Sequence, residues 1–335
     1  MTLEAPPAPL AAAIESFVRT HVPGVDALQY RLLSGGNSHI TWRVGTGAPG
    51  GDLVVKIAQP DGPLAPYDVA HEAEMMRRAH AAGVPAPASI GCFQDGDTQF
   101  LVMRLVEGDS PSIWEVRKWL EGRPDADRIG IGRSLLATLP LLTAAAGNGV
   151  SQVDAYTRYF KDLVDLLEAA ADGLMVLPPT IRAASDWLVE RLPQMEAPPT
   201  LCHGDFRIGN AVFRDGEIVA LFDWERAMIG HPLHDLGFLC LPGMKVEDKI
   251  CGVLTQQELE TVWRDLTGEV LDLRGAAYFR IVAVFGELCL MVRALARLAS
   301  GSGRLTAVRP LPLVIRLHDD LIKFIRMWDN GDFTL

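Results

Sequence analysis

The sequence predicts an α+β protein with two lobes, a small antiparallel sheet of five strands with one main helix and a larger, mostly helical lobe. Short β-prone runs separated by glycine-rich turns fill the first hundred residues, whereas long helical patterns dominate from about Pro111 onward. A chain of 335 residues is also long enough for two lobes with separate cores. We therefore expect a boundary near Gly108, with one lobe over 1–108 and the other over 109–335.

The individual elements follow from local patterns. Strands are expected in the runs ALQYRLLSGG, HITWRVGTG, DLVVKIAQ, APASIGCFQ and TQFLVMRLVEG. Between the third and fourth runs, DVAHEAEMMRRAHAAG has helical periodicity, with Asp68 placed to cap its start and Gly83 to end it. One β-prone island, 200–223, interrupts the second lobe. Helical patterns cover the rest of that lobe at 112–121, 126–146, 153–172, 178–192, 256–267 and 273–299.

Composition disfavours several classes of protein. A formal net charge of −11 provides no large basic field to attract phosphate backbones, so we expect no nucleic-acid partner. The five cysteines lie far apart without a C-x-x-C pair, which argues for reduced thiols. The start of the chain lacks the basic region of a signal peptide. The most apolar stretches, 129–146 and 281–299, contain charged residues and are interpreted as core helices. We therefore expect a cytoplasmic protein without a membrane partner.

The segment TLCHGDFRIGNAVFRDGEIVALFDWE, residues 200–225, carries a concentrated set of polar side chains. Its pattern predicts a loop, a short strand, a tight Asp-Gly turn and a second strand. Because a hairpin brings its two ends together, Asn210 and Asp223 should lie side by side. Amide and carboxylate oxygens are the ligands that Mg²⁺ prefers when it also binds phosphate. Asp205, on the same loop, is placed to accept a proton from an attacking hydroxyl group.

A buried ion pair is expected in the first lobe. Lys56 lies in the middle of an apolar strand, where an ammonium group is costly unless it is paired or at an exposed edge. On the following helix, the spacing places Glu72 on the inward face with Val69 and Met76. If both side chains point inward, the charge of Lys56 and the charge of Glu72 compensate each other in the buried interior. We expect them to form an ion pair that directs the ammonium towards phosphate oxygens; exposure at a sheet edge is the alternative for Lys56.

The motifs HGDFRIGN, FDWERAMIGHPLHDLG and HEAEMMRRAHAAGVPAP resemble the aminoglycoside phosphotransferase and choline kinase family, which has the protein-kinase-like fold. They are particularly similar to bacterial phosphotransferases related to the kinase-like domains fused to some acyl-CoA dehydrogenases. The resemblance covers roughly residues 25–300. It implies an enzyme that uses ATP and Mg²⁺ to phosphorylate a hydroxyl group of a small molecule, with the nucleotide bound by the N-terminal lobe and the acceptor by the C-terminal lobe.

The resemblance also implies roles for residues of the loop. Asp205 corresponds to the general base, and Arg207 to a cation that neutralises the transferring phosphoryl group. Asn210 and Asp223 correspond to the Mg²⁺ ligands.

The nucleotide site is implied in the same way. Lys56 resembles the lysine that holds the α- and β-phosphates, with Glu72 as its helix partner. The adenine is expected between Val54 and the segment MRLVEG, with backbone groups of Arg104 and Val106 recognising its edge.

Some features depart from the family or stay open. The phosphate-covering loop has glycines only at 35 and 36, and no long activation segment follows the metal aspartate, so peptide substrates are not expected. His203 and Asp235 would only brace the loop. A catalytically silent nucleotide-binding protein is one alternative, although the complete residue set counts against it. A phosphohydrolase with His203, Asp205 and Asp223 as metal ligands is another. The acceptor stays open among aminoglycosides, hydroxyacyl compounds, amino alcohols and sugars.

Overall fold

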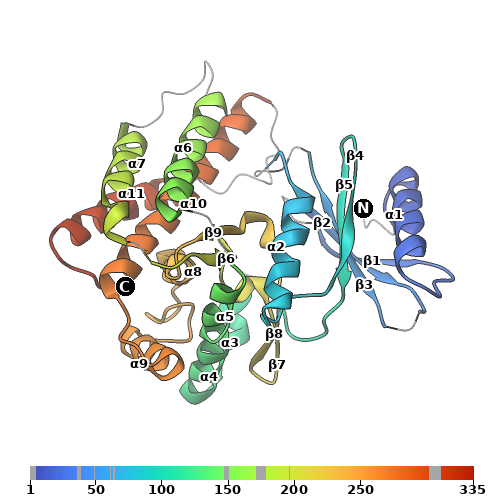
Figure 1. The fold of residues 1–335 in the computed structure, drawn as a ribbon, viewed down its shortest axis with the longest axis horizontal. Coiled ribbons are helices and arrows are strands. Elements are labelled where there is room, and N and C mark those ends of the chain that lie inside the picture. Colours follow the sequence, from blue (N-terminus) through green and yellow to red (C-terminus); the bar gives the residue numbers. More distant parts are fainter. Residues whose placement is uncertain are drawn as a thin grey trace.

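The computed structural model describes residues 5–35, 39–48, 50–60, 62, 65–112, 114–146, 151–170, 179–195, 197–301 and 311–335. A small twisted sheet with two flanking helices lies at one side of the molecule, and a larger helical body lies at the other (Figure 1). This confirms the predicted fold class. The expected glycine loop is described only at Gly35, whose backbone ends the first strand, while Gly36 lies outside the described residues.

The five strands predicted for the first lobe are all present. They form one antiparallel sheet in the order β1-β2-β3-β5-β4. The helix α2, Val69–Ala81, follows β3, and Asp68 accepts a hydrogen bond from the backbone nitrogen of His71 as its N-cap. The strands are β1 Gln29–Gly35, β2 His39–Gly45, β3 Leu53–Ala58, β4 Ser89–Asp95 and β5 Thr98–Arg104.

The helix α1 (Ala8–His21), which was not predicted from the sequence, covers one face of this sheet. Its buried residues Ile14 and Val18 are one helical turn apart and pack with Trp42 and Phe100. The helix α2 covers the opposite face, where its methionines join the core of the helical body. Lys56 therefore lies in a sheet that is covered on both sides.

The second lobe consists mainly of helices. The segment 126–146, expected as one helix, is two, because the chain turns near Thr138 and Pro140 falls in the first turn of the second helix, where a missing N–H is tolerated. Of the helix expected at 112–121 only a short part forms, and α8 and α11 were not predicted. The helices are α3 Val116–Leu120, α4 Asp125–Leu136, α5 Leu139–Ala144, α6 Gln152–Ala170, α7 Pro179–Arg191, α8 His234–Leu239, α9 Gln256–Thr267, α10 Leu273–Ala299 and α11 Leu311–Asp329.

The long helix α10 is the centre of the second lobe. It contacts α6, α7, α8 and α11 and is buried around most of its circumference, as expected for a helix that is apolar on all sides. Among the described residues, no helix is both long enough and apolar enough to cross a membrane.

The predicted hairpin of the β-prone island is confirmed. Strands β7 (Ala211–Arg214) and β8 (Glu217–Leu221) pair through a turn in which Asp215 and Gly216 both have positive φ, as a tight hairpin requires. Two further short strands, β6 (Thr200–Cys202) and β9 (Met228–Gly230), pair on either side of it in the sequence. Short 3-10 turns at Leu192–Met195, Ile208–Asn210, Trp224–Arg226 and Pro242–Met244 complete the lobe.

The connection between the lobes is held close to this hairpin. Asp109 exchanges two backbone hydrogen bonds with Phe213, at 2.7 and 2.8 Å. Gly108, just before it, has φ +158°, and a Cβ atom there would lie 2.5 Å from the carbonyl oxygen of Phe213. Only glycine permits this close approach of the two backbones. The segment after β5 is therefore fixed against the hairpin that leads to Asp223, the predicted metal ligand.

Candidate active site

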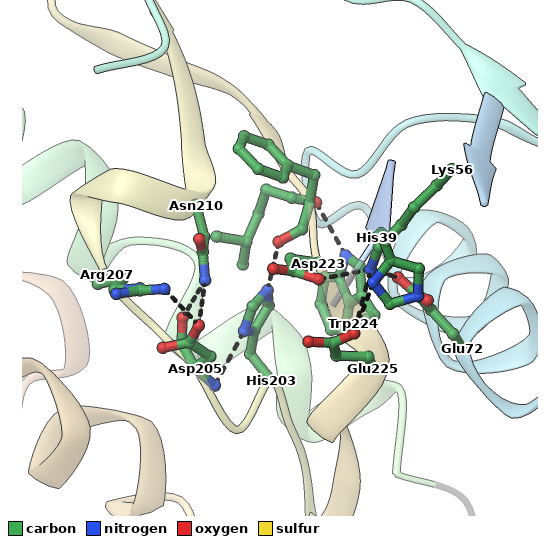
Figure 2. A network of polar contacts seen from close by, with 12 residues as sticks. His39, Lys56, Glu72, His203, Asp205, Arg207, Asn210, Asp223, Trp224 and Glu225 are labelled. Atoms are coloured by element: carbon green, nitrogen blue, oxygen red, sulfur yellow. Dashed lines mark hydrogen bonds and ion pairs between the residues drawn. The ribbon is translucent and has the colours of Figure 1, made fainter. Parts of the chain in front are cut away.

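Lys56 lies at the centre of the site. Its residue is only 8% exposed, and its Nζ atom lies 2.7 Å from Glu72 Oε1 and 2.5 Å from Asp223 Oδ1 (Figure 2). The predicted ion pair with Glu72 is therefore present, and the edge-strand alternative is wrong. Burial acts to lower the pKa of Lys56, but the surrounding carboxylates outweigh it and raise the pKa well above its usual range. The ammonium is thus charged and links β3, α2 and the end of the hairpin.

Asp223 adopts an unusual backbone conformation where the chain leaves β8. Its φ of 73° and ψ of 57° are left-handed, a region that a residue other than glycine occupies at a cost, and such strain clusters at functional sites. Burial acts to raise the pKa of Asp223, but the Lys56 ammonium outweighs burial and brings this pKa down to about 2. The carboxylate is consequently ionised throughout the physiological range.

The loop between β6 and β7 places Asp205 beside Asn210 and Arg207. The amide nitrogen of Asn210 donates hydrogen bonds to the Asp205 carbonyl at 2.8 Å and to Asp205 Oδ2 at 2.7 Å, and Arg207 Nη2 lies 2.8 Å from the same Oδ2. Burial raises the pKa of Asp205 to about 6, while the Arg207 guanidinium opposes that rise. Asp205 is therefore oriented by two donors and is a stronger base than an exposed aspartate.

His203 and Asp235 brace this loop. His203 Nε2 lies 2.9 Å from the carbonyl oxygen of Phe222, and His203 Nδ1 lies 3.2 Å from the backbone nitrogen of Asp205. Since the carbonyl oxygen can only accept and the backbone N–H can only donate, His203 carries its proton on Nε2. Asp235 accepts hydrogen bonds from the backbone nitrogens of His203 and Gly204 at 2.8 and 2.9 Å. Both ring nitrogens of His203 are thus occupied, which counts against a phosphohydrolase that uses His203 as a metal ligand.

The hairpin brings Asn210 and the end of β8 together, as the sequence predicted. The backbone nitrogen of Phe222 donates to the carbonyl oxygen of Asn210 at 2.9 Å, and Asp223 follows directly. Because Asn210 Nδ2 is directed at Asp205, the orientation of its amide leaves the oxygen for another partner. One oxygen of Asp223 contacts Lys56, and the other has no hydrogen bond to a described side chain. These two oxygens suit Mg²⁺.

A second group of residues also has the chemistry of a metal site. Ligand atoms of His39, Glu72 and Glu225 lie within 4.8 Å of one another. However, Lys56 Nζ lies 2.7 Å from Glu72 and 3.6 Å from Glu225, so an ammonium already supplies the cation there. Three carboxylates thus surround one ammonium, and burial raises the pKa of Glu225 to about 7, so protonation removes part of their negative charge near neutral pH.

The contact between His39 and Glu225 was not predicted from the sequence. His39 Nδ1 lies 3.0 Å from Glu225 Oε2, and both side chains are largely buried. Glu225 stands two positions after Asp223, and this short spacing was a signal that it would face the same site. His39, at the start of β2, is paired with Ala58 at the end of β3, the strand that carries Lys56. This pairing could be predicted only if the register of the two strands were known.

The residues proposed for the adenine site lie where the sheet meets the connection. Val54 is half-buried and pairs with Met103 across β3 and β5. The backbone nitrogen of Arg104 donates to the carbonyl oxygen of Ala88 at 2.9 Å, so it is not free to bind a ligand. Its side chain turns away to Gly50. The backbone of Val106, a partly buried residue, forms no hydrogen bond with another described backbone group outside the helices and strands.

This fold and this set of side chains define a kinase-like phosphotransferase. The family model described as "Phosphotransferase enzyme family" matches residues 29–280, and the chain belongs to that family. Its structure is similar to a putative aminoglycoside phosphotransferase from Ralstonia eutropha JMP134, with a TM-score of 0.69, 19% identity and coverage of 95% of this chain and 97% of the other. It is also similar to choline kinase LicA from Streptococcus pneumoniae, with a TM-score of 0.63, 15% identity and coverage of 95% and 99%.

Curated relatives include acyl-CoA dehydrogenase family member 11 of Rattus norvegicus, which is 28% identical over 257 residues. That match covers 68% of this chain and 30% of the relative. A probable acyl-CoA dehydrogenase of Arabidopsis thaliana, IBR3, is 32% identical over 168 residues, which cover 46% of this chain and 19% of the relative. The matched region thus spans less than a third of these proteins.

Proposed function

We propose that the protein transfers the γ-phosphate of ATP, with Mg²⁺, to a hydroxyl group of a small molecule. The observation that carries this proposal is the convergence of a buried, charged Lys56 with Asp223 at one end of the hairpin and of Asp205 with Asn210 at the other (Figure 2). Phosphoryl transfer depends on positioning and charge neutralisation, and these groups provide both. A catalytically silent protein would have no need of the complete set.

In this proposal each residue has a definite task. Lys56, held by Glu72, binds the phosphates, while Asp205 accepts the proton of the acceptor hydroxyl group as general base. Arg207 keeps a buried Nε atom without a hydrogen-bond partner among the described residues, which suits a phosphoryl oxygen. Asn210 and Asp223 would hold Mg²⁺, which when bound neutralises charge on the phosphates.

We also propose a separate task for each of the two lobes. Residues 1–108 bind the nucleotide, with the adenine between Val54 and the backbone of Arg104 and Val106. Residues 109–335 supply the catalytic loop and the acceptor site. We place the protein in the cytoplasm, where ATP is abundant and where its five free cysteines would stay reduced.

A direct test is transfer of label from γ-labelled ATP to a panel of alcohols in the presence and absence of Mg²⁺. Asp223→Asn should abolish Mg²⁺-dependent transfer. Asp215→Asn makes the same chemical change at an exposed hairpin turn, where asparagine tolerates positive φ, and should leave transfer unchanged. Equal transfer by the wild type and Asp223→Asn would contradict the proposal.

A further inference from the structure

A cavity of about 180 Å³ lies next to the loop that carries the proposed base. One of its walls is Gly204, the residue immediately before Asp205, and the others come mainly from α6 and α10. The volume is below the ~300–1,000 Å³ usual for ligand pockets, so the cavity suits a small ligand or one end of a longer one. The cavity therefore adjoins the loop that carries the proposed base, although Asp205 is not itself one of the lining residues.

The lining combines aliphatic side chains with positive charge. Leu163, Leu166 and Leu290 form an apolar part. None of the lining residues is an aspartate or glutamate, whereas two of them, Arg226 and Arg293, are arginines. His234, which also lines the cavity, adds no charge at neutral pH, because burial lowers its pKa to about 3.

The two arginines differ in how their charge is balanced. Arg226 Nη1 lies 2.5 Å from Glu287 Oε1, so this guanidinium has a carboxylate partner. Arg293 is also largely buried, at 9% exposure, but its hydrogen bond among the described residues goes from Nη2 to the carbonyl oxygen of Ala65. No described carboxylate forms an ion pair with it. Burial lowers the pKa of Arg293, and Arg297 lowers it further.

A buried charge without a counter-ion is costly, and a guanidinium has five N–H donors. Arg293 uses one donor for a neutral carbonyl group and also lines the cavity. A carboxylate would match it in charge and in planar, two-pronged geometry. By contrast, a polycation would enter a cavity in which the charge of Arg293 is not balanced by a described carboxylate, at a cost in free energy.

We propose that this cavity is the acceptor site and that it selects an alcohol with an aliphatic body and a carboxylate group, which binds Arg293. The inference rests on the proposed function and specifies its substrate class. It separates this chain from structural neighbours whose names refer to cationic acceptors, such as the gentamicin-bound phosphotransferase with a TM-score of 0.58.

The test compares three linear alcohols that differ only at the far end: 6-hydroxyhexanoate, 1-hexanol and 6-amino-1-hexanol. Binding of each to the full chain with Mg·ADP is measured by calorimetry, and phosphorylation is measured with ATP. A charge-assisted hydrogen-bonded contact predicts a preference of about tenfold to hundredfold for the carboxylate over the amine. Arg293→Met should abolish that preference with little change for 1-hexanol.

Arg297→Met is the matched control. Arg297 lies one turn further along α10 and also donates to the Ala65 carbonyl, at 3.4 Å, but it does not line the cavity. It should keep the carboxylate preference. The inference would be overturned by equal or stronger binding of the amine, by absence of carboxylate binding at millimolar concentration, or by an equal loss in both variants. Failure of the proposed function appears separately, as absence of Mg·ATP binding.

Discussion

Lys56 and Asp223 are 167 positions apart in the sequence, and their side chains meet at 2.5 Å between Nζ and Oδ1. The contact joins the third strand of the sheet to the end of the hairpin in the helical lobe. It therefore depends on both lobes being correctly folded and correctly placed. The same ammonium contacts Glu72 on α2, so one cation holds three elements together.

Removal of the Lys56 charge should therefore damage stability as well as activity. Lys56→Met leaves Glu72, Asp223 and Glu225 without their shared cation, and breaking a buried pair in this way costs about 3–5 kcal/mol. Urea denaturation would measure the loss. Adding Glu72→Gln should recover part of the stability but none of the phosphoryl transfer. Lys161→Met, at an exposed i,i+4 pair on α6, should leave stability nearly unchanged, because solvent screens such a pair.

The pH profile of kcat/KM should report the ionisation of the base. Burial raises the pKa of Asp205 to about 6, and only the ionised carboxylate can accept a proton. Activity should therefore increase as the pH rises through about 6 and level off above about 7. The measurement is the initial rate at subsaturating acceptor with saturating Mg·ATP. A profile that is flat between pH 5 and pH 7 would contradict the assignment of Asp205 as the base.

Buried neutral histidines should make the protein sensitive to acid. Burial lowers the pKa of His234 to about 3, below the ~6.5 of an unfolded chain. The unfolded state thus binds the proton first, and stability is lost as the pH falls below about 6.5. Between pH 7.5 and pH 5 the contribution of His234 is about 2 kcal/mol. His234→Gln should remove this part of the pH dependence.

The free energy of unfolding is best compared between His234→Gln and the wild type at pH 7.5 and at pH 5. Asp235, whose pKa burial raises to about 6, gains protons on folding and acts in the opposite direction over part of the range. The comparison cancels such common contributions. Identical pH dependence in the two proteins would show that His234 is already protonated or accessible in the folded state.

Much of the first lobe could be predicted because its signals are local. Alternation in the strands and the helical spacing of Glu72 are enough to predict the ion pair with Lys56. The hairpin signal likewise predicts that Asn210 lies near Asp223. By contrast, α1 buries only one narrow face, and the break between α4 and α5 depends on a single proline within an otherwise helical pattern.

The features of the site that were not predicted from the sequence depend on contacts between distant segments. His39 meets Glu225 only through the strand register and the turn after β8. The uncompensated charge of Arg293 is visible only when its neighbours are known, because its partner Ala65 lies 228 positions earlier in the sequence. The charges that face one another within a cavity cannot be predicted from a sequence pattern alone.

The central claim is tested most directly by single-turnover transfer from ATP to an accepted alcohol in the wild type and Asp205→Asn. The substitution removes the base but keeps the shape of a side chain that the loop holds in place. We predict a loss of about 10²–10⁴-fold in the transfer rate with Mg·ATP affinity unchanged. A variant that transfers phosphate at the wild-type rate would contradict the account, because Asp205 would then not be the group that accepts the proton.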